Sequence, residues 1–356
     1  MDKKRLLYIM GIDWEWIYQR PQILAQKLSR DYRITVVFPR SVLSANRKLP
    51  SETGIEFRIL WTIPLQEKNT LIGKSAMVMN QKLWRDLDVF EMVYVGYPLY
   101  ARYIPTSYCG KIIYDCMDNH EMLYPYPKGV DKVVAQEKQL IQRCDLLLTS
   151  AIKLQEKMDK IAGYSKSRLL RNGTHTECLG EVRVPKIKEK YTVGYVGTIA
   201  EWFDFSVLLK SLDRFSQIEY HLVGPALKRE EQERIIYHGC VEHHALEEVI
   251  KEYDCLIMPF QVNEIVAYVD PVKLYEYIAS GKCIISVYYP EIERFRDFVY
   301  FYRDSREYME LMGKMIKEGF PAKYDKEQQK AFLLDNSWDM RYRELRDLIQ
   351  KITFSS

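Results

Sequence analysis

The sequence alternates short apolar runs with amphipathic helical patterns, and this alternation passes through the chain twice. In the first series, strand-like runs cover residues 5–10, 33–39, 92–98, 110–118 and 144–150, and helical patterns cover 16–31 and 130–144. Apolar strands separated by helices are typical of a parallel sheet that helices cover on both faces. The sequence therefore predicts the α/β class.

The pattern restarts after residue 190. Strand-like runs cover 191–197, 218–225, 235–241, 255–260 and 282–288, and helical patterns cover 205–215, 229–235 and 243–253. The segment 181–190 is charged and has no apolar period, which is typical of a linker. With 356 residues the chain is longer than a single hydrophobic core ordinarily supports. We predict two Rossmann-like domains, 1–180 and 191–336, joined by this linker, with an amphipathic tail at 337–356 that must pack on the rest.

The composition is that of a soluble globular protein, with 47% apolar and 28% charged residues. No apolar run approaches the ~20 residues that cross a bilayer. Lys3 to Arg5 and the apolar run after them imitate a signal peptide, but Asp13 and Glu15 follow too early for a secretory core. The seven cysteines are scattered and form no CxxC pair, and His243 and His244 lack an obvious third ligand. We expect a cytoplasmic protein without disulfides, cofactor or metal.

The charge is divided unevenly along the chain. Residues 1–180 carry 27 Lys and Arg against 19 Asp and Glu, a net +8, and residues 181–356 carry a net −5. A basic half favours an anionic partner or a membrane surface, and the 27 tyrosines suit a headgroup layer. The alternative is an accidental imbalance of solvated charge. We expect peripheral association with the inner face of the cell membrane and no nucleic-acid binding.

Several familiar nucleotide and catalytic motifs are absent from the sequence. GIDWEW stands after the first strand in place of GxGxxG, and neither GxxxxGK[ST] nor GxSxG occurs. These absences disfavour a nicotinamide or flavin dehydrogenase, a P-loop nucleotidase and an α/β-hydrolase.

Glycines end three predicted strands of the second domain. Gly197 and Thr198 follow the first of them, Gly224 follows the second, and Gly239 with Val241 follows the third. The backbone N–H groups of such a turn and of the next helix form a natural anion site that suits a diphosphate. The alternative is that glycine serves only the tight turn.

The stretch DPVKLYEYIASG in the second domain reads as a loop that becomes a helix. Pro271 starts this predicted helix and Asp270 is its expected N-cap. Lys273 and Glu276 are three residues apart and share a face. The carboxylate suits the two hydroxyls of a ribose, and the lysine suits a phosphate or a sugar hydroxyl. The alternative is a surface ion pair.

Charged and aromatic residues follow the first predicted strand of the chain. Asp13, Trp14 and Glu15 come directly after it, and Arg20 stands at the start of the next helical pattern. A carboxylate at this edge of a parallel sheet could act as general base toward an incoming hydroxyl. The alternative is that Asp13 caps the helix and the tryptophan packs.

Several segments resemble the GT-B-fold glycosyltransferases, near retaining family 4 and bacterial cell-surface polysaccharide enzymes of the teichuronic-acid type. They are WIYQRPQILAQKLS and YDCMDNHEML in the first half and VGYVGTIAEWFD, HLVGP, DCLIMPF and DPVKLYEYIASGKCIIS in the second. The resemblance implies two Rossmann-like domains that face each other across a cleft, with the tail crossing back to the first. It implies a nucleotide-sugar on the second domain, an acceptor on the first, and no metal.

The resemblance also implies roles for single residues. Glu276 would hold the nucleotide ribose, Gly197 and Thr198 would meet the diphosphate, and Val241 would lie near the base. Gly224 and Lys273 complete the expected donor site, and Trp14, Arg20 and Asp118 are candidates for the acceptor cleft.

The sequence departs from the family pattern at one position. Family 4 members often carry a second glutamate eight residues before the ribose-binding one, and here that residue is Tyr268. Both retaining and inverting chemistry stay open. An inverting enzyme needs a base, for which Asp13 or Glu15 is the candidate, with Asp13 preferred.

The expected function is transfer of a sugar from a UDP-, GDP- or dTDP-sugar to a lipid-linked or polysaccharide acceptor in cell-envelope synthesis. Two alternatives stay open: a nucleotide-sugar epimerase of GT-B fold, and a catalytically silent partner subunit of a glycosyltransferase.

Overall fold

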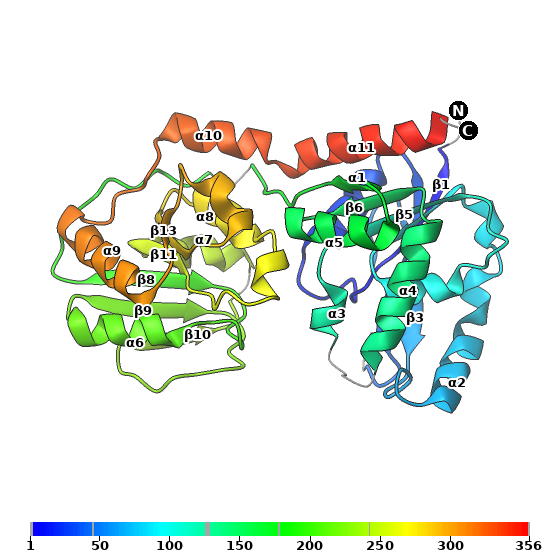
Figure 1. Ribbon diagram of the computed structural model, residues 1–356, viewed down its shortest axis with the longest axis horizontal. Helices are drawn as coiled ribbons and strands as arrows, with labels where there is room; N and C mark the ends of the chain where they lie inside the picture. The colour runs from blue at the N-terminus through cyan, green and yellow to red at the C-terminus, as the bar shows by residue number, and fades with distance from the viewer. Residues whose placement is uncertain (1–2, 45, 125–128, 177–178, 242, 355–356) are drawn as a thin grey trace. The chain divides into compact units, whose positions relative to one another are not determined.

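The computed structural model describes residues 3–44, 46–124, 129–176, 179–241 and 243–354 (Figure 1). The chain divides into two compact units: unit 1 comprises residues 1–171 and 341–356, and unit 2 comprises residues 172–340. Each unit is built around its own parallel sheet with helices packed against it.

Unit 1 contains a sheet of seven parallel strands in the order β3-β2-β1-β4-β5-β6-β7. The strands are β1 Arg5–Ile9, β2 Arg33–Ser41, β3 Ile55–Thr62, β4 Met92–Val95, β5 Lys111–Cys116, β6 Leu146–Thr149 and β7 Ser167–Leu169. The helices of the unit are α1 Arg20–Leu28, α2 Thr70–Asn80, α3 His120–Leu123, α4 Val130–Arg143 and α5 Ile152–Ala162, with 3-10 turns η1 Gln81–Trp84, η2 Leu87–Val89 and η3 Pro98–Tyr103.

Unit 2 repeats the same topology with six parallel strands in the order β10-β9-β8-β11-β12-β13. The strands are β8 Tyr191–Val196, β9 Ile218–Val223, β10 Ile235–Gly239, β11 Cys255–Met258, β12 Cys283–Val287 and β13 Tyr300–Tyr302. The helices are α6 Phe205–Arg214, α7 His243–Lys251, α8 Val272–Ala279, α9 Ser305–Glu318 and α10 Lys326–Asp335, with 3-10 turns η5 Val266–Tyr268 and η6 Pro290–Phe295.

The central strands of both sheets are apolar on both faces because helices cover them. Every residue of β4, β6, β11 and β12 is buried. In each sheet the strand order reverses next to the first strand, between β1 and β4 and between β8 and β11. Ligands of such sheets bind outside the carboxyl ends of the strands at this reversal. The predicted α/β class with two parallel sheets is confirmed.

Some predicted elements differ from the observed ones. Residues 229–235 form no helix and lead as coil into β10. The reason is that this charged stretch has no apolar stripe, and the Arg234 guanidinium donates instead to the carbonyl oxygens of Phe215 and Ile218. Helix α1 begins at Arg20 and not at residue 16. Strands β3, β7 and β13 and helices α2, α3 and α5 were not predicted.

The first unit ends nine residues earlier than the predicted boundary at 180, and the predicted linker 181–190 belongs to unit 2. Its backbone is fixed there, because the N–H of Arg183 donates to Gly281 O at 2.8 Å and the Arg183 guanidinium pairs with Asp254 at 2.6 Å. The C-terminal helix α11 Trp338–Phe354 carries the chain into unit 1, where the Tyr342 hydroxyl donates to Asp31 at 2.6 Å.

The cysteines that the structure describes are free thiols, and Cys178 lies outside the described residues. The side chains of His243 and His244 are also outside the described part.

Candidate functional site

Three glycines form the floor of the carboxyl edge of the unit 2 sheet. Gly197, Gly224 and Gly239 end the neighbouring strands β8, β9 and β10, and all have positive φ, at 144°, 128° and 69°. The N–H of Gly197 donates to Val223 O at 2.8 Å, and that of Gly224 donates to Gly239 O at 2.7 Å. A Cβ on Gly224 would lie 2.3 Å from Gly197 O. The chain therefore needs glycine at these turns, and the backbone there is not covered by a side chain of these three residues.

Lys273 of α8 lies directly against this floor. A Cβ built on Gly197 would stand 2.1 Å from the Lys273 Cε and 2.7 Å from its Nζ, and the Nζ is 5.9 Å from the centroid of the Tyr195 ring. Burial lowers the pKa of Lys273, and the Glu276 carboxylate raises it in part. A half-buried ammonium beside a glycine turn is suited to an anion, which would restore the favourable environment of the charge.

Glu276 lies one turn further along α8 and is exposed. Thr198 directly follows Gly197, and its carbonyl oxygen accepts a 2.9 Å hydrogen bond from the Tyr195 hydroxyl. Val241 is half-buried two residues after Gly239, and Tyr268 ends η5 just before α8. The carboxyl edge of the sheet and the start of α8 therefore bring Lys273 together with Gly197 and Gly224, which the sequence singled out.

Helix α8 is held against β8 by a hydroxyl near the C-terminal end of the helix that sequence reasoning did not identify. The buried Tyr277 hydroxyl accepts a 3.0 Å hydrogen bond from the N–H of Val196, the last residue of β8. The next residue after Val196 is Gly197, so this bond places α8 against the glycine floor. No pattern in the sequence distinguishes Tyr277 from the many other buried tyrosines.

Asp270 is not the N-cap of α8, which corrects the sequence prediction. The helix begins at Val272 with Pro271 as its N-cap. The Asp270 carboxylate is buried and bonded to the Arg294 guanidinium and the Tyr275 hydroxyl, and it accepts from the N–H of Asn172 at 2.7 Å. These contacts hold the loop before α8 from three directions.

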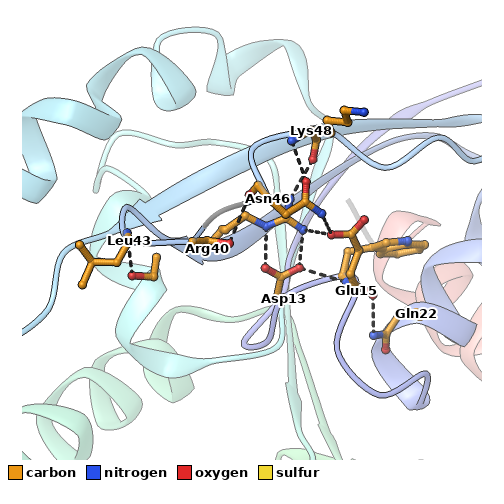
Figure 2. Close-up of polar contacts among 10 residues, drawn as sticks. Asp13, Glu15, Gln22, Arg40, Leu43, Asn46 and Lys48 are labelled. Carbon is orange, nitrogen blue, oxygen red and sulfur yellow. Dashed lines mark hydrogen bonds and ion pairs between the residues drawn. The ribbon is translucent and has the colours of Figure 1, made fainter.

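In unit 1, the carboxylates of Asp13 and Glu15 share one arginine (Figure 2). Arg40, at the end of β2, donates to both oxygens of Asp13 at 2.7 Å and to Glu15 at 2.6 Å. Asn46 donates to the same Glu15 oxygen at 2.6 Å. The two carboxylates therefore connect the loop after β1 to the loop after β2.

This arrangement argues against the general-base role that the sequence suggested for Asp13. Burial raises the pKa of Asp13, but hydrogen bonds from Arg40 and the Glu15 backbone lower it by more, so its pKa lies below the usual value. A carboxylate with a lowered pKa is a weak base. Arg40 was missed because it lies 27 residues further along the chain with no local motif.

Arg20 is buried and bonded within unit 1. It is 4% exposed, and its guanidinium donates to both Asp115 oxygens at 2.8 and 3.0 Å and to Leu170 O at 2.9 Å. Trp14 is half-buried and packs edge-on against Phe57 of β3, with ring centroids 4.7 Å apart. Both side chains have contacts within unit 1, and their part in an acceptor cleft stays a prediction.

Asp118 differs from the other unit 1 carboxylates. It follows β5 at the carboxyl edge of the sheet and is half-buried, and its carboxylate has no hydrogen bond or ion pair with the described residues. Burial raises the pKa of Asp118, Arg20 lowers it and Asp115 raises it, with a net increase. This carboxylate therefore has the proton affinity and the free oxygens that Asp13 lacks.

No protein-family model matches the chain. Among curated proteins, it is 22% identical over 278 residues to the putative teichuronic acid biosynthesis glycosyltransferase TuaH of Bacillus subtilis strain 168, covering 70% of this chain and 68% of that protein.

Solved structures of similar fold align over almost the whole chain. Sucrose-phosphate synthase from Thermosynechococcus elongatus is 12% identical with a TM-score of 0.75, covering 99% of this chain and 100% of that one. The Anabaena protein HepE, solved with UDP and glucose, is 12% identical with a TM-score of 0.62, covering 99% of both chains. The predicted resemblance to GT-B-fold glycosyltransferases is confirmed.

We predict that Gly197→Ala lowers the affinity for inorganic diphosphate by more than about tenfold. An added Cβ at φ 144° would both strain the backbone and displace Lys273. Gly163→Ala is the matched control, because Gly163 also has positive φ, at 87°, but no atom lies within 4 Å of its added Cβ. Isothermal titration of both variants provides the comparison, and equal affinity in both would contradict the anion site.

We predict that Asp13 stabilises unit 1 through Arg40 in a pH-dependent way. The folded pKa is lowered, so this stabilisation is present above about pH 4 and is lost as the pH falls through the folded value. Asp13→Asn should cost roughly 1–3 kcal/mol in urea unfolding at neutral pH, and its difference from wild type should shrink near pH 3. Glu15→Gln, at a more exposed carboxylate, should cost less. A pH-independent difference would refute the ion-pair account.

Proposed function

We propose that this protein is a glycosyltransferase that binds a nucleotide-sugar in unit 2 and transfers the sugar to an acceptor. The observation that carries the proposal is the half-buried Lys273 ammonium seated on Gly197, at the strand-order reversal of a parallel sheet. TuaH, the relative found by sequence, is named as a putative glycosyltransferase, which supports the same activity.

The donor would bind along the carboxyl edge of the unit 2 sheet. Its diphosphate would lie on the backbone of Gly197, Thr198 and Gly224 beside Lys273, its ribose hydroxyls on Glu276, and its base near Val241. The HepE structure contains UDP and glucose, which favours a UDP-sugar over the GDP and dTDP alternatives. Backbone N–H groups and Lys273 would stabilise the diphosphate leaving group, so the transfer needs no metal at this site.

The acceptor would bind unit 1 as a lipid-linked or polysaccharide hydroxyl, the class that the name of TuaH suggests. We assign to Asp118 the role of receiving a proton from that hydroxyl, because it follows β5 at the carboxyl edge of the sheet and its carboxylate has no hydrogen bond or ion pair with the described residues. We therefore move the base role from Asp13 and Glu15 to Asp118. A base is required when the configuration at the sugar inverts.

Unit 1 also carries a surface suited to an anionic membrane. In α2 the side chains of Leu71 and Val78 are 75% and 72% exposed, and Met77 and Met79 are also exposed. Residues 68–85, around this helix, contain four basic residues and no acidic one. Exposed apolar side chains flanked by lysine and arginine are typical of segments that lie in a lipid interface. The proposal places the enzyme at the inner face of the cell membrane through α2.

No helix in the described part of the chain has both the length and the apolar character to cross a bilayer.

We predict that wild-type protein binds UDP and that Glu276→Ala weakens this binding by about tenfold to a hundredfold, as expected for one lost charged hydrogen bond. Glu310→Ala, at an exposed glutamate of α9, is the control and should leave the affinity unchanged. Calorimetry with UDP, GDP and dTDP measures the effect and ranks the bases. Absence of binding to any of the three would refute the donor site.

We predict that Asp118→Asn lowers kcat by a factor of about 10² or more and leaves UDP affinity unchanged, because base catalysis contributes about that much. Asp13→Asn should keep kcat within about tenfold of wild type. Turnover is followed as UDP release with and without acceptor. Conversion of the donor sugar without an acceptor would favour the epimerase. Absence of both sugar transfer and epimerisation would favour the silent subunit. A large loss in Asp13→Asn alone would restore Asp13 as the base.

We predict that the double variant Leu71→Asp/Val78→Asp loses binding to vesicles of phosphatidylcholine and phosphatidylglycerol. Two carboxylates would both remove apolar contact and oppose the lipid charge. Leu227→Asp is the matched control, since Leu227 is 77% exposed in unit 2. Cosedimentation measures the bound fraction, and equal binding of the wild type and the double variant would refute the role of α2.

A further inference from the structure

Three side chains with metal-binding atoms meet in the interior of unit 1. Cys116 is the last residue of β5, His120 is the first residue of α3, and Glu137 lies in α4. One ligand atom of each lies within 4.8 Å of the other two, and the Cys116 Sγ is 3.9 Å from the Glu137 Oε1. Their exposed fractions are 0%, 8% and 2%. This cluster belongs to unit 1, whereas the residues proposed to hold the donor belong to unit 2.

His120 is the member of the cluster that local structure leaves unexplained. Its Nε2 is buried and has no hydrogen-bond partner among the described residues, although buried polar atoms in folded proteins almost always have one. The ring therefore leaves a buried nitrogen without a protein partner among the described residues, and a ring nitrogen is the atom through which histidine binds a metal.

We propose that Cys116, His120 and Glu137 bind a divalent cation of the zinc class. A thiolate, a neutral imidazole and a carboxylate are the ligands that Zn²⁺ prefers, and the two anionic ligands neutralise its charge in a buried setting. Metal–ligand bonds of about 2.0–2.3 Å in a tetrahedron place ligand atoms roughly 3.3–3.8 Å apart, so a contraction of about 1 Å closes the site. A water takes the fourth position, and the thiol proton of Cys116 leaves to solvent.

The surroundings of the cluster suit this role. The Tyr114 hydroxyl donates to the Glu137 Oε1 at 2.5 Å and so orients the carboxylate. In metal sites, hydrogen bonds from neighbouring groups orient the ligating side chains in the same way. The Cys116 thiol points to the carbonyl oxygen of Asp118 at 3.4 Å. A metal held by Cys116 and His120 would fix both ends of the short loop that carries Asp118. The cation would therefore position the Asp118 carboxylate, to which the proposed function gives the role of base.

The test is a Co²⁺ titration of the full chain after removal of metals with a chelator. We expect one equivalent of Co²⁺ to produce a thiolate-to-cobalt absorption band, and Zn²⁺ to abolish the band and raise Tm. Cys116→Ser should lose the band, and Cys144→Ser, at another buried cysteine of unit 1, should keep it. Tyr114→Phe should weaken Co²⁺ binding by about 10- to 100-fold.

A band that is absent in the wild type, or equally strong in Cys116→Ser, would overturn the proposal. The second result would assign the band to the exposed thiols of Cys109 or Cys240. If circular dichroism shows that Cys116→Ser does not fold, His120→Asn replaces it, and unchanged Co²⁺ affinity in that variant overturns the proposal equally. UDP binding by unit 2 is measured on the same samples, so failure of the metal site is distinguishable from failure of the donor site.

Discussion

The contact between α8 and the end of β8 is the constraint on which the rest of the unit 2 site depends. The Tyr277 hydroxyl accepts from the Val196 N–H and donates to the Val196 carbonyl oxygen, which ties the helix to the strand. The glycine that follows lets the Lys273 side chain lie against the backbone. A residue with a Cβ at 197 would occupy the space of that lysine. The position of the Lys273 ammonium therefore depends on the missing side chain at Gly197. The buried Asp270 carboxylate, bonded to Asn172 and Arg294, holds the loop before the helix.

In unit 1, two aspartates at the carboxyl edge of the same sheet, Asp13 and Asp118, have pKa values shifted in opposite directions. Asp13 faces the Arg40 guanidinium, which lowers its pKa and holds it as an anion bound within the fold. Asp118 is half-buried without a neighbouring cation in hydrogen-bond contact among the described residues, so burial raises its pKa. The difference lies in the partners that tertiary structure supplies. It separates a residue that holds loops together from one whose carboxylate has no hydrogen bond or ion pair with the described residues.

The sequence predicted those features that depend on local pattern. Apolar runs located the central strands, and glycine at their ends located Gly197 and Gly224, because only glycine tolerates the backbone there. It did not predict features that depend on distant partners. The ion pair between Arg20 and Asp115 joins residues 95 positions apart, and it turned a candidate cleft residue into a buried one. Residues 229–235 have helix-forming residues but no apolar face to bury, so the predicted helix was wrong.

The central claim is that a nucleoside diphosphate binds across the glycine floor and the start of α8. Amide hydrogen exchange of the full chain, with and without UDP, tests it most directly because it reports on each segment of backbone separately. The account predicts slower exchange, on UDP binding, in the peptides that contain Gly197 to Ile199, Gly224 and Val272 to Glu276, with unit 1 unchanged. Protection confined to unit 1, or no change in those unit 2 peptides at saturating UDP, would contradict it.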